Sequence, residues 1–204
     1  RFIQRAVDQT AGEAFVSLLE VNEVPSATVM CRSEALGAIR GFQQPAGMPF
    51  VDNPTWLELC KVGRQTAVPE VLGYYRSHDD QVSTTMNHEM YGTGDWISAV
   101  VDGLSPTDLA TLHLDVTELH RVADRRRSVE QFARGKFALR DGQRDEAIGF
   151  FQAAARRGPA STRLYGYLGL VCARTGVDLE YPLRLRKLAI DQKDRFTADK
   201  SKAE

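Results

Sequence analysis

Apolar residues recur at helical spacing through the middle of the chain. They follow one another in steps of three and four, which places their side chains on one face of a helix. The residues of this stripe are Leu109, Leu112, Val116, Leu119 and Val122. Ser105 and Pro106 precede the stripe and are typical N-cap and first-turn residues. The pattern predicts one long helix that begins after Ser105 and buries this stripe.

An internal repeat follows the stripe. Gly135 and Gly142 recur as Gly169 and Gly176, each displaced by 34 residues, which is the period of the tetratricopeptide helix-turn-helix unit. The first unit also has small, aromatic and proline residues where that pattern has them, at Gly135, Gly142, Ala147, Phe151, Ala154 and Pro159. The second unit departs from the pattern at Tyr181 and Pro182, so the repeat amounts to about one and a half units.

The repeat predicts an antiparallel helical hairpin formed by residues 128–140 and 144–157. Gly135 should lie opposite Ala147 or Phe151, because a small residue lets two helices approach closely. Ser128 and Gln131 fit a capping box at the start of the first helix. One and a half units cannot bury a solenoid core alone, so we expect the hairpin to pack on the preceding domain.

The first 83 residues combine short apolar runs with Gly and Pro punctuation. The run "SATVMCR" at 26–32 and the runs at 65–69 and 71–76 predict strands. Ser33 predicts the cap of a short helix that is closed by Gly41. Asn53 and Pro54 predict the start of another. In this second helix Trp56, Leu59 and Cys60 share one face, so Trp56 should pack inward.

Composition places the chain among globular proteins with a real core. It has 204 residues, of which 43% are hydrophobic and 26% charged, with a formal net charge of -1. This charge gives no general reason to expect a nucleic acid partner. No apolar stretch reaches the length of about 20 residues that a membrane span needs. Three separated cysteines without a CxxC pair argue against a disulfide framework and against a thiolate zinc site.

Two further charged features favour structural interpretations. The run of Arg121, Arg125, Arg126 and Arg127 lies beside acids and predicts a solvated helix end. His113 and His120 are seven residues apart on the expected long helix, a spacing that is weak for a metal site without a nearby acid.

Four features in fixed order resemble the C-terminal half of family 2 glycosyltransferases over about residues 15–83. They are "PSATVMCR", then "RGF" at residues 40–42, then "VDNPTW", and then "VLGYYRSH". The family has a strand ending in Arg, a Gly-Gly-Phe, an acidic pair before a Trp-bearing helix, and Tyr-Arg-x-His. The resemblance implies an α/β fold, the acceptor half of a GT-A type domain, followed by the all-α extension.

The resemblance assigns roles to individual residues. Asp52 matches the aspartate that serves as catalytic base, which takes the proton of the acceptor hydroxyl during inverting transfer. Trp56 would support this site, and Arg76 and His78 would face the nucleotide diphosphate, with His78 also contacting a divalent ion, Mg or Mn. The alternatives from the residues alone are a helix-capping Asp52 and a hydrogen-bonded surface His78. For Arg32, which ends the first predicted strand, a structural role is the alternative: it would pair with a carboxylate behind the site.

The chain also departs from the family. Val51 and Pro54 stand where the family usually has acids, and no Asp-x-Asp occurs anywhere in the chain. That motif holds the metal and sugar diphosphate in GT-A enzymes, so the donor-binding half is missing and this chain alone should be inactive. Because it begins at Arg1, we expect it to be a piece of a longer protein or a processed product.

Together these features predict four segments and one principal function. The segments are residues 1–86, the acceptor-side part; 87–127, a helical extension; 128–192, the tetratricopeptide-like helices; and 193–204, a charged tail. The function implied is transfer of a sugar from a nucleotide-sugar to a glycan, lipid-linked or protein acceptor, in bacterial surface polysaccharide or glycoconjugate synthesis. The expected location is the cytoplasm or the inner face of the membrane. The alternative is a non-catalytic interaction module that binds a protein partner through its helices.

Overall fold

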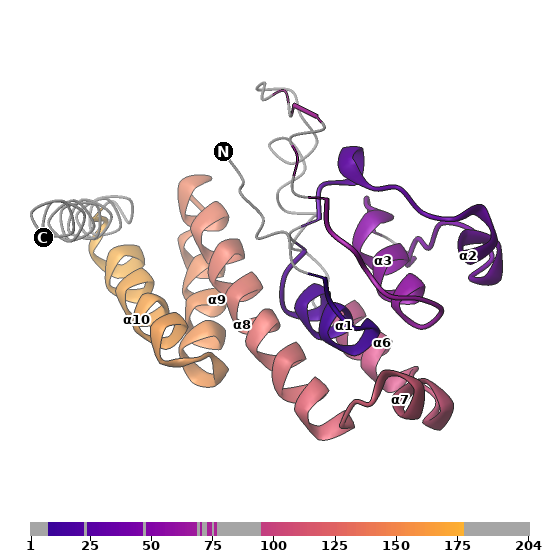
Figure 1. Ribbon diagram of the computed structural model, residues 1–204. Coiled ribbons are helices and arrows are strands. Elements are labelled where there is room, and N and C mark those ends of the chain that lie inside the picture. The colour runs from indigo at the N-terminus through magenta and orange to yellow at the C-terminus, as the bar shows by residue number, and fades with distance from the viewer. Residues whose placement is uncertain are drawn as a thin grey trace, which may run out of the picture.

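Helices make up the regular structure of the described residues (Figure 1). The computed structural model describes residues 8–22, 24–46, 48–68, 70, 73, 74, 76 and 95–177. No β-strand occurs within these ranges, and an isolated antiparallel bridge joins Gln9 to Gln65. In this part of the chain every helix is too short or too polar to cross a membrane.

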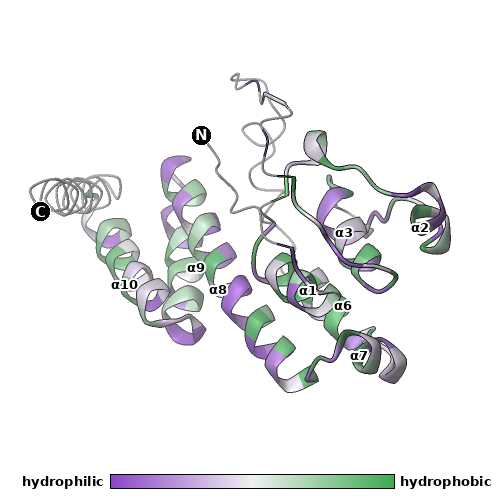
Figure 2. Cartoon of the chain, in the orientation of Figure 1, coloured by the Kyte–Doolittle hydropathy of each residue, from purple (hydrophilic) through white to green (hydrophobic). Residues whose placement is uncertain are grey.

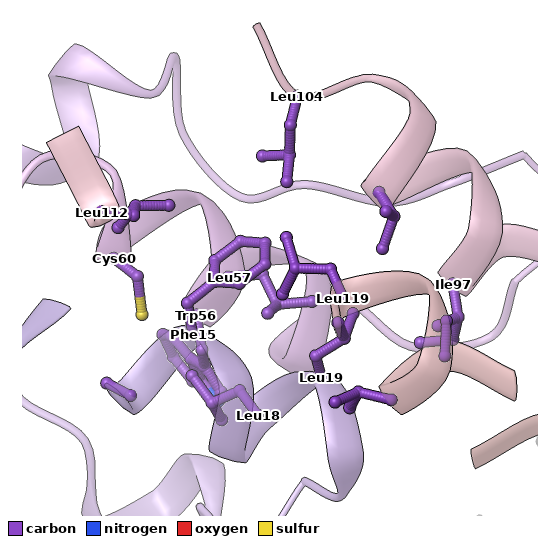
Figure 3. Close-up of a cluster of buried hydrophobic side chains, with 14 of the residues drawn as sticks. Phe15, Leu18, Leu19, Trp56, Leu57, Cys60, Ile97, Leu104, Leu112 and Leu119 are labelled. Carbon is purple, nitrogen blue, oxygen red and sulfur yellow. The ribbon is translucent and has the colours of Figure 1, made fainter. Parts of the chain in front are cut away.

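The first core forms where several short helices meet the beginning of one long helix. These helices are α1 (Ala11–Glu20), α3 (Asp52–Cys60), α6 (Asp95–Asp102), α7 (Pro106–Leu112) and the first turns of α8 (Val116–Arg140). Phe15 and Leu19 of α1, Leu57 of α3, Ile97 of α6 and Leu119 of α8 are fully or almost fully buried in it (Figure 3). The core therefore joins segments that are about 100 residues apart in the sequence.

Side-chain caps explain where the helices around this core begin. Thr10 and Glu13 form a capping box at α1, and Ser105 and Asp108 form another at α7. Each box satisfies backbone N–H groups that have no partner inside the helix. The Asp115 side chain accepts a hydrogen bond from the Glu118 N–H at the start of α8.

The second core lies between the end of α8, α9 (Arg144–Arg157) and α10 (Ala160–Thr175), which lie side by side in Figure 1. Phe151 of α9 is fully buried at its centre. A Cβ added to Gly135 of α8 would lie 2.6 Å from the Phe151 ring, and one added to Gly169 of α10 would lie 2.5 Å from it. The predicted hairpin is confirmed, including the contact of Gly135 with Phe151.

The predicted α/β fold of the first part is wrong. The run at 26–32 contains one 3-10 turn (Ser26–Thr28), in which the Thr28 N–H and hydroxyl both bond to the Pro25 carbonyl. Met30 is 92% exposed, and Val29 is only partly buried. A strand needs a neighbour for its backbone groups, and this segment pairs with none among the described residues.

The other two predicted strands are not borne out either. In the run at 65–69, only Gln65 takes part in a bridge, while Val68 is 54% exposed. In the run at 71–76, Gly73, Tyr74 and Arg76 are described and none lies in a strand. The rest of that run lies outside the described residues.

The two short predicted helices begin close to the expected positions, but the residues predicted as their N-caps lie inside the helices. Helix α2 (Ser33–Ala38) begins after Arg32, so Ser33 is its first residue and not its cap, and Gly41 closes it with φ 89. Helix α3 begins at Asp52 after Val51, so Asn53 lies inside the helix. Trp56 and Cys60 are buried, as predicted.

The predicted long helix is two helices. It begins after Ser105 as expected, but α7 ends at Leu112 because His113 adopts a left-handed conformation with φ 55. Helix α8 then runs through Ser128, whose hydroxyl donates to the Asp124 carbonyl. Ser128 is therefore no helix cap. Figure 2 shows hydrophilic and hydrophobic stretches alternating along α8, which contributes to both cores.

Candidate functional site

Asp52 is the first residue of α3, and the buried residues behind it fix that helix. Trp56 is 5% exposed and Leu57 is fully buried. The Asn53 amide donates to the Leu18 carbonyl of α1 at 3.2 Å. The start of α3 is therefore tied to the last turns of α1 by both packing and a buried hydrogen bond.

The Asp52 carboxylate is held by side chains of the loop that follows α1. Asn22 Nδ2 donates to Asp52 Oδ2 at 3.0 Å, and Ser26 Oγ donates to the same oxygen at 3.3 Å. Two side chains therefore hold this carboxylate. Asp52 does not act as the side-chain cap of α3, so the capping alternative loses its structural basis.

The structure describes some of the remaining predicted site residues, but not all of them. Trp56 lies in the core, where its Nε1 finds no hydrogen-bond partner among the described residues, and its packing fixes the position of α3. Arg76 is described as exposed, while His78 lies outside the described residues. Arg32, at the N-terminal end of α2, is exposed. A meeting of Arg76 and His78 with Asp52 remains a prediction.

A shallow groove opens elsewhere, between the start of α1 and the α7–α8 connection. Glu13, Ser17, His113 and Leu114 are among the residues that line it, and Asp52 is not. Gly12 lies against the Leu112 carbonyl there, with no room for a Cβ. This groove is therefore separate from the surroundings of Asp52.

The residues present do not make a metal site within the described ranges. No three His, Cys, Asp or Glu side chains gather there closely enough to hold an ion. His113 and His120 were expected on one helix but are separated by the break before α8. His120 Nε2 lies 3.5 Å from Asp102 Oδ1. Divalent Mg or Mn therefore stays a prediction, and no step proposed below passes through it.

The three cysteines have free thiols, and their environments differ. Cys31 is exposed, while Cys60 and Cys172 are buried. Burial raises the pKa of Cys60 to about 12, which keeps this thiol protonated and unreactive near neutral pH.

Arg126 is the residue whose role the sequence least suggests. It was expected on a solvated helix end, but its side chain is 13% exposed and pairs with Glu130 at 2.9 Å. Its Nη1 donates to the carbonyls of Leu18 at 3.0 Å and Leu19 at 3.2 Å. The guanidinium also lies 5.1 Å from the centre of the Trp96 ring.

Arg126 therefore holds the last turn of α1, from which the loop that contacts Asp52 begins. The Leu18 carbonyl accepts from both Arg126 of α8 and Asn53 of α3, so three helices meet at one backbone oxygen. Asn22 lies four residues after Leu18 in the sequence. No sequence motif could have indicated it, because Leu18 and Arg126 are 108 residues apart.

Comparison with family models, with curated proteins and with solved structures finds no match for this chain.

Proposed function

We propose that this chain carries the acceptor-side base of an inverting, nucleotide-sugar-dependent glycosyltransferase, and that Asp52 is the base. The observation that carries the proposal is the Asp52 carboxylate at the start of α3, held through one oxygen by Asn22 and Ser26. It supports the proposal because a general base must be both fixed and able to accept a proton. The order of sequence features around Asp52 supplies the reaction class.

The chemistry asked of Asp52 is a single proton transfer. The acceptor hydroxyl oxygen attacks the anomeric carbon, the bond from that carbon to the diphosphate breaks, and the hydroxyl proton passes to the carboxylate. The nucleoside diphosphate leaves with the bonding electron pair.

The partners and location follow from the same proposal. The donor is a nucleotide-sugar and the acceptor a glycan, a lipid-linked sugar or a protein, with the reaction in the cytoplasm or at the inner face of the membrane. Arg76 and His78 are proposed to face the diphosphate, so Arg76→Ala and His78→Ala should raise the donor KM. A normal donor KM in both variants would remove them from the site.

The test of Asp52 is the variant Asp52→Asn in the natural protein that carries this sequence. Release of nucleoside diphosphate is measured with a panel of UDP- and GDP-sugars. Asparagine keeps the size of the side chain and removes its basicity, so kcat should fall by about 10²–10⁴-fold with little change in donor KM.

A matched control is Asp115→Asn, at the start of α8. Asp115 is also a carboxylate at a helix start, and Asn caps a helix as well as Asp does, so turnover should stay normal. If Asp52→Asn turns over at the wild-type rate, the catalytic role of Asp52 is wrong.

The second candidate is an interaction module, and the packing of α8, α9 and α10 around Phe151 favours it. Helical repeats of this kind present extended surfaces to protein partners. This reading becomes the better one if Asp52→Asn and wild type turn over alike, or if wild type releases no nucleoside diphosphate from any donor.

A further inference from the structure

The loop between α1 and α2 approaches Asp52 with a defined geometry. Two neutral donors from this loop, the Asn22 amide and the Ser26 hydroxyl, converge on the same carboxylate oxygen, Oδ2. Among the described residues no hydrogen bond to Oδ1 is formed. The two oxygens of one carboxylate therefore have different environments.

The orientation of the Asn22 amide is set by the backbone. Asn22 Oδ1 accepts a hydrogen bond from the Val24 N–H at 3.3 Å, a turn that Asn side chains commonly form with the residue two positions on. Because the amide oxygen is occupied there, the NH₂ group is the end that faces Asp52. Asn22 thus presents a donor to the carboxylate.

The position of Ser26 is set by the short turn that it begins. Pro25 precedes the turn with φ -69, and the Thr28 N–H and hydroxyl both bond back to the Pro25 carbonyl. This leaves the Ser26 hydroxyl free of the turn's own hydrogen bonds. It can therefore donate to Asp52 without weakening the turn.

The loop itself is anchored to the core at its beginning. The Val21 N–H bonds to the Ser17 carbonyl at the end of α1, and the neighbouring Leu18 carbonyl is held by Asn53 and Arg126. A side chain positioned by such a supporting shell keeps one orientation, which catalysis by a general base requires.

Neutral donors suit a base better than a cation would in this place. An Arg or Lys beside the carboxylate would form a strong ion pair and oppose its protonation. An amide and a hydroxyl fix the group while leaving its second oxygen able to take a proton.

We propose that Asn22 and Ser26 are positioning residues, which hold Asp52 through Oδ2 and leave Oδ1 as the oxygen that accepts the proton of the acceptor hydroxyl. This assignment rests on the proposed glycosyltransferase function.

The first arm of the test measures the contact without any activity. In the chain of 204 residues, the variants Asn22→Ala and Asp52→Ala and their double variant are unfolded in urea. We expect the two substitutions to be coupled by about fivefold in the unfolding equilibrium constant, since hydrogen bonds to charged groups are strong but this one is partly exposed. The control cycle of Asn22→Ala with Asp115→Ala should give no coupling. Absence of coupling between Asn22 and Asp52 overturns the proposal.

The second arm measures turnover in the natural protein, again as nucleoside diphosphate release from UDP- and GDP-sugars. Asn22→Ala and Ser26→Ala should each lower kcat by about tenfold and leave the donor KM unchanged, because a misplaced base costs rate and not donor binding. Ser26→Thr keeps a hydroxyl and should restore most of the rate. The control Ser33→Ala removes an exposed hydroxyl at the start of α2 that takes no part in this turn and does not contact Asp52, and should behave as wild type.

The outcomes separate the two proposals. If Asp52→Asn is inactive while Asn22→Ala and Ser26→Ala keep kcat within twofold of wild type, the positioning role is overturned and the proposed function stands. If Asp52→Asn turns over normally, or wild type releases no nucleoside diphosphate, the proposed function itself is overturned. A tenfold loss in both positioning variants, with rescue by Ser26→Thr, supports both.

Discussion

The two cores of this molecule solve the same packing problem by different means. The first core fills its space with large side chains from several short helices, among them Phe15, Trp56 and Leu57, and includes a buried ion pair at its edge. The second is centred on one aromatic ring, Phe151, which glycines of α8 and α10 approach closely and against which Phe132 also packs. In the second core, the close approach of the helix backbones restricts which residues fit. In the first core, side-chain volume and polar contacts restrict them.

This difference determines how each core should fail. Deleting the central ring of the second core leaves a cavity beside Gly135 and Gly169, which have no side chains to fill it. In the first core, many large neighbours share each contact, so the polar junction at Leu18 is the more sensitive point. Both tryptophans, Trp56 and Trp96, belong to the first core, so their fluorescence reports on that core separately.

The largest effect is expected for Phe151→Ala. The free energy of unfolding should fall by about 3–5 kcal/mol, the usual range for deletion of a buried Phe. Urea unfolding followed by far-UV circular dichroism measures it. Phe150→Ala, at a partly buried neighbour on the same helix, should cost about 1 kcal/mol. Because α8 belongs to both cores, the tryptophan fluorescence midpoint should move as well, and a fluorescence midpoint unchanged from wild type would show that the cores unfold independently.

The next effect is expected for Arg126→Met. The substitution keeps the length of the side chain but leaves Glu130 buried without its partner, which should cost about 3 kcal/mol. The double variant Arg126→Met with Glu130→Leu should recover part of this loss, since an apolar pair can replace a buried ion pair. The rest reflects the hydrogen bonds from Arg126 to the Leu18 and Leu19 carbonyls. Arg121→Met removes an exposed partner of Glu118 and should change stability by less than about 1 kcal/mol. Equal losses at Arg126 and Arg121 would mean that burial of the pair has no energetic consequence.

A smaller effect with opposite signs is expected at two helical glycines. A Cβ at Gly166 would lie 2.8 Å from the Ala155 backbone nitrogen and 2.9 Å from the Phe151 carbonyl oxygen. Backbone atoms cannot move aside, so Gly166→Ala should destabilise by about 1–2 kcal/mol after its gain in helix propensity. At Gly149 nothing lies within 4 Å, and Gly149→Ala should stabilise by up to about 1 kcal/mol. Thermal unfolding of the two variants checks the signs, and stabilisation by both would contradict the close approach of α9 and α10.

The smallest effect is the pH dependence introduced by Glu130. Burial raises the pKa of Glu130 above its usual value of 4.5, although Arg126 opposes the shift. A carboxyl whose pKa is raised on folding contributes full stability below the unfolded pKa and loses it as pH rises through the folded pKa. Wild type should therefore lose stability relative to Glu130→Gln as pH rises from 4.5 through the raised pKa. Parallel stability curves for the two proteins would exclude this contribution, and Glu118→Gln on the surface serves as the control.

Sequence periodicity predicted the second core because its helices contact their neighbours in the chain. The two glycines one period apart, Gly135 and Gly169, meet the same Phe151 ring, so the repeat in the sequence corresponds directly to a repeat of contacts. The same reasoning located α3 and the start of α7, where local residues decide the structure.

The sequence was less informative where contacts between distant segments determine the local structure. The run at 26–32 has strand-like composition, but a strand also needs a partner, and composition does not reveal one. His113 breaks the expected long helix through its own backbone conformation, although Asp115, three residues before Glu118, is a cap signal that could have marked the restart. At the candidate site, sequence reasoning selected Asp52 but missed Asn22, Ser26 and Arg126, whose roles depend on loop geometry and on contacts across the fold.

The number of residues in helix α8 determines how the second core is rotated relative to the first. Its 25 residues run without a break from Val116 to Arg140, a length of about 37 Å. One residue inserted near Ser128 would turn the second core by about 100° around the helix axis relative to Asp52, while moving it only about 1.5 Å away. Seven inserted residues would move it about 10 Å yet return it to within about 20° of its original direction. The direction in which the second core faces is therefore held by helical phase and tolerates change in length only in steps of whole turns.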